Sequence, residues 1–88
     1  MKDDIRVILA DNNVQDRESK KRLLNEQGIQ VVYETGDGKK ALENIKKLKP
    51  DVVVMDMILP GVDGLEILEE CREFTEYKPL FIIATALR

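Results

Sequence analysis

The segment DVVVMDMILPGVDG, residues 51–64, contains the features that decide the fold. A continuous apolar run, residues 52–55, precedes one carboxylate, Asp56, at the point where a strand must end. One proline and two glycines then turn the chain before an amphipathic stretch begins. Continuous rather than alternating apolar residues are typical of a strand covered on both faces, as in a parallel sheet flanked by helices. Asp56 is therefore placed for chemistry rather than for packing.

On both sides of this segment, predicted strands alternate with predicted helices. Short apolar runs rich in β-branched residues predict strands, and apolar residues at a period of 3.6 predict helices. The strands cover about residues 5–10, 29–34, 51–55 and 80–85, and the helices about 14–27, 38–49 and 65–74. Gly28 and Pro50 end the first two helices, and Asp37 caps the second. The order βαβαβαβ predicts an α/β fold with one parallel sheet and right-handed crossovers.

The composition of the 88 residues indicates one small globular domain spanning residues 1–88. A net charge of −3 without a basic stripe argues against direct binding of nucleic acid. The lack of histidine and the single cysteine, Cys71, exclude a Cys/His zinc site and an internal disulfide. Helical spacing from Leu65 and Leu68 predicts that Cys71 is a core thiol rather than a nucleophile. A charged N-terminus and no long apolar run predict neither a signal peptide nor a membrane span, so we expect a cytoplasmic protein.

Two carboxylates are expected to meet at one edge of the sheet. In open parallel sheets, ligands bind beyond the C-terminal strand ends, at the point where the strand order reverses. With strand order 2-1-3-4, that point lies between the strands ending at Asp11 and Asp56, and Thr85 ends the neighbouring fourth strand. Clustered oxygens with net negative charge suit Mg²⁺, and a carboxylate beside the metal can attack phosphorus to form an aspartyl phosphate. The alternative is that Asp11, Asp56 and Asp63 only satisfy turn amides, and the constellation favours the chemical interpretation.

These motifs resemble the receiver domain of two-component response regulators. The resemblance rests on Asp11 after an apolar strand, on residues 51–64 and on IIATA at residues 82–86, and it runs through all 88 residues. It implies a flavodoxin-like, doubly wound sheet in which Asp56 receives a phosphoryl group from a histidine kinase or phosphotransfer protein with Mg²⁺. It also implies that Thr85 contacts the phosphate and that the backbone carbonyl of Ile58 ligates Mg²⁺. Such a domain is a signalling switch rather than an enzyme with an external product.

Two departures from the family pattern bear on this expectation. Receivers usually carry an acidic pair after the first strand, and its second member is typically the direct metal ligand. Asn12 stands at that position. Its amide oxygen can coordinate Mg²⁺ but brings no charge, so we expect a lower Mg²⁺ affinity.

Receivers also continue through a final helix, strand and helix, and that strand supplies a lysine which pairs with the phosphoryl group. Neither Lys78 nor Arg88 is placed to replace this lysine, so the sequence resembles a receiver that stops after its fourth strand.

The expected stop after the fourth strand leads to a prediction of self-association. The apolar strand at about residues 80–85 is expected at the edge of the sheet, where an uncovered strand is an association site. The resemblance also implies that the first helix has a bared face, because a fifth helix normally covers it. At about 25 cal/mol per Å², burying a few hundred Å² of exposed apolar surface between two chains would contribute several kcal/mol of free energy to association. We therefore expect a homo-oligomer formed through the fourth strand or the bared face.

Two alternative functions belong to other classes. The first is a receiver-like protein-interaction module that has lost efficient phosphorylation, which Asn12 and the missing lysine both favour. The second is a flavodoxin-like nucleotide binder or a small phosphohydrolase. The first loop, residues 11–13, lacks the glycines of a phosphate-cradling turn, which argues against the second alternative.

Overall fold

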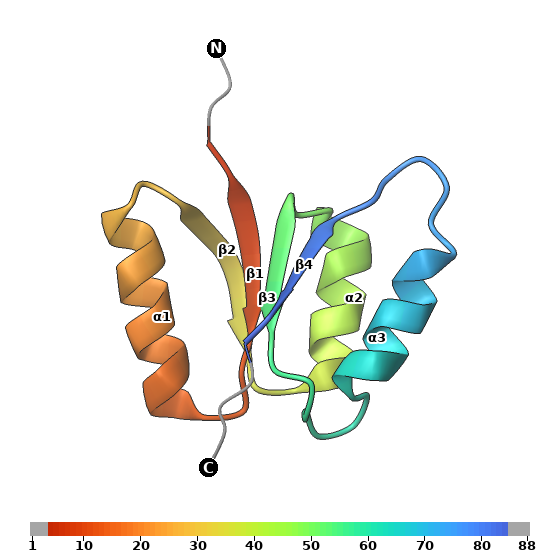
Figure 1. Ribbon diagram of the computed structural model, residues 1–88, viewed down its shortest axis with the longest axis horizontal. Coiled ribbons are helices and arrows are strands. Elements are labelled where there is room, and N and C mark those ends of the chain that lie inside the picture. The colour runs from red at the N-terminus through yellow and green to blue at the C-terminus, as the bar shows by residue number, and fades with distance from the viewer. Residues whose placement is uncertain (1–3, 85–88) are drawn as a thin grey trace.

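The computed structural model describes residues 4–84 and contains every predicted strand and helix in the predicted order (Figure 1). The strands are β1 (Arg6–Ala10), β2 (Gln30–Thr35), β3 (Val52–Met55) and β4 (Leu80–Ile83), and the helices are α1 (Val14–Glu26), α2 (Gly38–Leu48) and α3 (Gly64–Arg72). The ends of these elements differ from the predicted ends by small amounts. Strand β4 ends at Ile83, and Thr85 lies outside the described residues.

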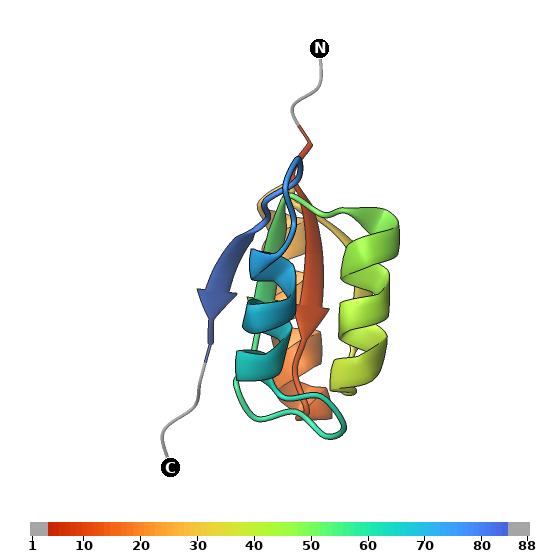
Figure 2. The same cartoon turned by 90° about the vertical axis from the view of Figure 1, so that its right-hand side faces the viewer.

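The four strands form one parallel sheet with the order β2-β1-β3-β4, which confirms the predicted topology. Strand β1 is central, and it pairs with β2 on one side and with β3 on the other. Helix α1 lies on one face of the sheet, whereas α2 and α3 lie on the opposite face (Figures 1 and 2). The chain therefore changes sides between β1 and β3, and this change creates the expected switch point at the C-terminal ends of those two strands.

The hydrophobic core lies between the sheet and the α2–α3 layer. Alternate residues of β1 and β3 point into it, and the two helices contribute small and branched apolar side chains. Its fully buried members include Ile8, Ala10, Val53, Met55, Ala41, Ile45 and Ile67. Phe81 of β4 packs against this cluster, so its neighbours Leu80 and Ile82 point to the opposite face of the sheet.

Helix α3 presents a different face to the core from the one that the sequence predicted. Ile67 and Cys71 are buried, but the side chain of Leu65 is 55% exposed. The helix begins at Gly64 with Asp63 as its N-cap, and this start turns Leu65 toward solvent while Leu68 is partly buried. The core position predicted for Cys71 is confirmed, and burial raises the pKa of its thiol to about 11. A thiol with that pKa stays protonated near neutral pH and is a weak nucleophile.

Strand β4 occupies the edge of the sheet and is poorly covered. Leu80, Ile82 and Ile83 are 62%, 47% and 42% exposed, respectively. Helix α1 lies over β1 and β2 rather than over β4, and none of its own residues is buried (Figure 1). The predicted apolar edge is therefore present. Within residues 4–84, no helix is both long and apolar enough to cross a membrane.

Candidate functional site

Strand register places Asp11 and Asp56 side by side at the C-terminal edge of the sheet. Ala10 of β1 pairs with Met55 of β3, and each of the two aspartates directly follows one of these residues. The backbone N–H of Asp56 donates a 2.9 Å hydrogen bond to the carbonyl oxygen of Ala10, which extends the ladder beyond the strands. The predicted juxtaposition of the two carboxylate-bearing residues is present.

The carboxylate of Asp11 is almost fully buried, and both of its oxygens are engaged. Its side chain is 4% exposed. Oδ1 accepts a 2.9 Å hydrogen bond from the backbone N–H of Asn13, and Oδ2 lies 2.5 Å from the ammonium nitrogen of Lys20. The backbone carbonyl of Asp11 accepts a 2.7 Å hydrogen bond from Nη1 of Arg17. A buried carboxylate needs such partners, because burial without them carries a large desolvation penalty.

Sequence reasoning missed Lys20, although a spacing signal was present. Arg17, Lys20 and Leu24 fall at i, i+3 and i+7, so they share one face of α1. The ion pair with Asp11 shows that this face is directed toward the sheet edge. The first turns of α1 therefore contact the sheet through basic rather than apolar side chains. A search for apolar residues at helical spacing does not find this face for that reason.

A second ionic cluster joins α1 to β2 beside the site. Oε1 of Glu34 lies 3.2 Å from Nε of Arg17, and Oε2 lies 2.6 Å from the ammonium nitrogen of Lys21. The hydrogen bond from Lys21 holds the pKa of Glu34 below its ordinary value, and the same contact raises the pKa of Lys21. This cluster anchors α1, which has no buried residue of its own, against the sheet.

Asp56 is half-buried, and its carboxylate is less occupied than that of Asp11. Oδ1 accepts a 3.1 Å hydrogen bond from the backbone N–H of Ile58. In the part of the chain that the structure describes, no hydrogen bond or ion pair engages Oδ2. Asp56 therefore combines a fixed orientation with one oxygen that can accept a new bond.

Close backbone contacts hold the loop between β3 and α3 against this edge. The N–H of Gly38 donates a 2.9 Å hydrogen bond to the carbonyl of Pro60, and the N–H of Gly64 donates one of 2.8 Å to the carbonyl of Met57. A Cβ atom on Gly38 would lie 1.6 Å from the carbonyl oxygen of Val62, so only glycine fits there. The loop is thereby packed against the start of α2, and Ile58 is kept beside Asp56.

Residues at or next to this edge carry oxygen atoms of the types that a hard divalent cation accepts. Carboxylates of Asp11 and Asp56, the amide of the exposed Asn12 and the backbone carbonyl of Ile58 are ligand types that Mg²⁺ accepts, with water completing its shell. Among residues 4–84, no three side chains of the His, Cys, Asp and Glu types gather as a metal site.

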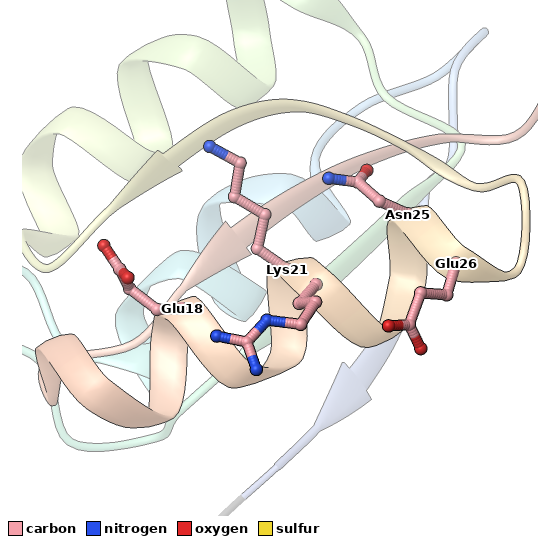
Figure 3. Close-up of a pocket in the computed structure, with 5 residues that line it drawn as sticks. Glu18, Lys21, Asn25 and Glu26 are labelled. Atoms are coloured by element: carbon pink, nitrogen blue, oxygen red, sulfur yellow. The ribbon is translucent and has the colours of Figure 1, made fainter.

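Three hollows on the surface of the described residues lie away from the two aspartates. One of about 430 Å³ runs along α1, where it is lined by Glu18, Lys21, Arg22, Asn25 and Glu26 (Figure 3). All five side chains come from one helix, and the hollow includes neither Asp11 nor Asp56.

This chain resembles known proteins in both its sequence and its fold. The family model of the response regulator receiver domain matches residues 7–88. Transcriptional regulatory protein TrcR of Mycobacterium tuberculosis is 41% identical over 83 residues, which cover 91% of this chain and 31% of the relative. DNA-binding transcriptional activator EvgA of Escherichia coli is 35% identical over 66 residues, which cover 75% of this chain and 32% of the relative. The chain thus spans about a third of the length of these two relatives.

Other relatives and a solved structure extend the comparison. A protein-glutamate methylesterase/protein-glutamine glutaminase of Myxococcus xanthus is 31% identical over 93% of this chain and 24% of its own length, so some relatives carry an enzyme name. The signal receiver domain of the regulator NarL from Mycobacterium tuberculosis superposes with a TM-score of 0.89 and 32% identity, covering 99% of this chain and 70% of that one. The predicted flavodoxin-like fold is confirmed, and the chain belongs to the response regulator receiver domain family.

Proposed function

We propose that this domain is a phosphoacceptor switch in which Asp56 receives a phosphoryl group from a histidine kinase or phosphotransfer protein. One observation carries the proposal: Asp56 is oriented through Oδ1, while Oδ2 has no partner among the described residues, at the edge where Asp11 directly follows β1. The proposal treats residues 1–88 as one unit located in the cytoplasm with its phosphodonor. It assigns no external product to the domain.

The chemistry requires a nucleophilic carboxylate and a way to offset negative charge. An oxygen of Asp56 forms the new O–P bond while the bond from phosphorus to the donor breaks, and the donor leaves with the electron pair. Asp56 is available for this attack because its orientation is set by the N–H of Ile58. Thr85 is proposed to contact the phosphoryl group, as the family resemblance implies.

We propose Mg²⁺ as the cofactor at this edge. Asp11, Asp56, the amide of Asn12 and the backbone carbonyl of Ile58 would hold it, and these oxygens are the observation that supports the assignment. When bound, Mg²⁺ would supply positive charge that offsets the charge of the incoming phosphoryl group. Asp11 supports the same edge through its fixed carboxylate, which the N–H of Asn13 orients.

The test is incubation with acetyl phosphate and Mg²⁺, followed by intact mass measurement. We expect one phosphate on the wild-type chain and none on Asp56→Asn. Asp63→Asn is the matched control, because Asp63 is exposed at the same end of the sheet and caps α3 by accepting from Glu66. Asparagine caps a helix about as well as aspartate, so this control keeps the fold. Labelling of Asp56→Asn at the wild-type level would refute the proposal.

A second candidate function, a protein-interaction module with impaired phosphorylation, is favoured by specific observations. Asn12 brings no charge to the edge, and Lys20 already neutralises Asp11. An interaction module does not need the metal. Isothermal titration with Mg²⁺ separates the two functions, since heat of binding that disappears in Asp11→Asn favours the phosphoacceptor and no binding favours the module.

Self-association is proposed as a further property of the domain. The apolar side chains of Leu80 and Ile82 are 62% and 47% exposed on the sheet face that α1 leaves open at β4. An exposed apolar edge strand is a template for pairing with another chain. Sedimentation velocity over a range of protein concentrations tests this. A mass that stays monomeric at every concentration excludes it.

A further inference from the structure

The ion pair between Lys20 and Asp11 places a cation of the chain itself at the edge where a metal would bind. The two charged atoms lie 2.5 Å apart, and the side chains of Lys20 and Asp11 are 33% and 4% exposed, respectively. Water therefore screens the carboxylate poorly, and the ammonium is its main counter-charge. Such a contact is more than a surface ion pair, because one of its partners is desolvated.

The partners of Asp11 leave no oxygen of its carboxylate without a donor. Oδ1 accepts from the backbone N–H of Asn13, which is fixed at the start of α1, and Oδ2 accepts from Lys20. The neighbouring Arg17 does not compete for these oxygens, since its guanidinium bonds the backbone carbonyl of Asp11 and the carboxylate of Glu34. Of the two bonds to the Asp11 carboxylate, only the one from Lys20 comes from a flexible side chain that can move away.

The charges at the sheet edge also indicate that the Lys20 ammonium and a divalent cation would not both be held there. Two carboxylates, Asp11 and Asp56, with one ammonium leave a single net negative charge at the edge. A divalent cation that replaced the ammonium would bring the edge to neutrality, whereas both cations together would leave it positive. Like charges confined at one site repel each other, and the low exposure of Asp11 strengthens this repulsion.

We propose that Lys20 is a tethered competitor of the divalent cation at Asp11, so that metal binding requires the ammonium to leave Oδ2. The inference rests on the metal site of the proposed function and adds to it a residue that sets metal affinity. Lys20 is not a ligand of the metal in this scheme. Its ammonium is held near the site by α1 and bonds Oδ2 of Asp11, the oxygen that the metal would use.

The test compares Mg²⁺ and Mn²⁺ affinities of four proteins by isothermal titration at fixed ionic strength. Lys20→Gln removes the competitor, Lys20→Arg keeps its charge, and Lys21→Gln removes the same charge from the next residue of α1, which pairs with Glu34 instead. We expect Lys20→Gln to bind Mg²⁺ about tenfold more tightly than the wild type, equivalent to about 1.4 kcal/mol. Lys20→Arg and Lys21→Gln should stay within about twofold of the wild type, because a tenfold effect needs the direct contact.

Thermal unfolding supplies a readout that does not depend on phosphorylation. Without metal, Lys20→Gln should have a lower Tm than Lys21→Gln, because the buried carboxylate of Asp11 then lacks its counter-charge. Saturating Mg²⁺ should remove this difference, since the metal takes over the role of the ammonium. A difference that persists unchanged at saturating Mg²⁺ would assign Lys20 a structural role only and overturn the competition.

The outcomes separate this inference from the proposed function. Equal or weaker Mg²⁺ binding by Lys20→Gln, with normal labelling of Asp56 by acetyl phosphate, overturns the competition and leaves the phosphoacceptor intact. Tighter binding by Lys20→Gln without any labelling of Asp56 supports the competition and contradicts the phosphoacceptor. Absence of Mg²⁺ and Mn²⁺ binding in all four proteins overturns the metal site and the competition together.

Discussion

The backbone amide of Asp56 donates to the carbonyl of Ala10 at 2.9 Å, and this bond sets Asp11 and Asp56 side by side at the C-terminal ends of the two strands. The bond joins Ala10, the last paired residue of β1, to the residue that follows its partner Met55 in β3, so Asp11 and Asp56 emerge from the same edge. The geometry of the site is thus a consequence of parallel register rather than of the loops. Substitutions at this edge that leave the pairing of β1 with β3 intact should therefore change metal binding or phosphorylation without unfolding the domain.

Asn12→Asp should raise Mg²⁺ affinity. The substitution adds a third carboxylate at the edge, and we expect about a tenfold gain that weakens with added salt. Isothermal titration measures it. Asn13→Asp is the matched control, since it adds the same charge one residue later while its side chain remains the N-cap of α1. An equal gain in both variants would show that net charge, not ligation at position 12, sets the affinity.

Gly38→Ala should destabilise the fold severely. The new methyl would lie 1.6 Å from the carbonyl oxygen of Val62, so the loop beside Asp56 must move. We expect a loss of about 3 kcal/mol in the free energy of unfolding, at the upper end for overpacking. Urea denaturation measures this loss. Gly28→Ala, which meets open space but has a φ of 79°, should lose only about 1 kcal/mol. Similar losses in the two variants would contradict the close approach of the loop.

Glu34 should make stability depend on acid pH. Its pKa is lowered in the folded state, mainly by the hydrogen bond from Lys21. A lowered pKa means that its stabilisation is fully present above the unfolded value of about 4.3 and is lost as pH falls through the folded value. Glu34→Gln should therefore be less stable than the wild type at pH 7, and the gap should shrink in acid. Denaturant unfolding at several pH values tests this, and the exposed Glu69→Gln is the control. A gap that is constant with pH would contradict it.

Ile82→Lys should weaken self-association. Ile82 is 47% exposed on β4, and a charge on an edge strand opposes pairing with a second chain. We expect the dissociation constant of the oligomer to rise about tenfold or more, measured by sedimentation equilibrium. Leu65→Lys changes a side chain with 55% exposure on α3 and should leave association unchanged. The same loss in both variants would locate the contact away from β4.

The strands, helices and strand order could be predicted from the sequence because local signals determine them. The continuous apolar run at residues 52–55, the cap at Asp37 and the helix end at Gly28 each depend on a few neighbouring residues, and the structure confirms all three. Side-chain partners across elements were harder to foresee. Lys20 reaches Asp11 only because of how α1 crosses the sheet edge.

The faces of helices also depend on where the helices begin. A start at Gly64 exposes Leu65, whereas apolar spacing alone counted it with the buried face. Asn12 could be identified from the sequence as a departure from the acidic pair of the family, but its exposure is a property of the folded edge. The role of Thr85 stays a prediction, because that residue lies outside the described part of the chain.

The central claim is that Asp56 is the phosphoacceptor, and locating the phosphate at residue level tests it most directly. After incubation with acetyl phosphate and Mg²⁺, borohydride reduction converts an aspartyl phosphate to homoserine, which peptide mass spectrometry assigns to one position. The predicted result is homoserine at position 56 and unmodified aspartate at Asp11, Asp37 and Asp63. Homoserine at any of those three positions, with unmodified Asp56, would contradict the claim.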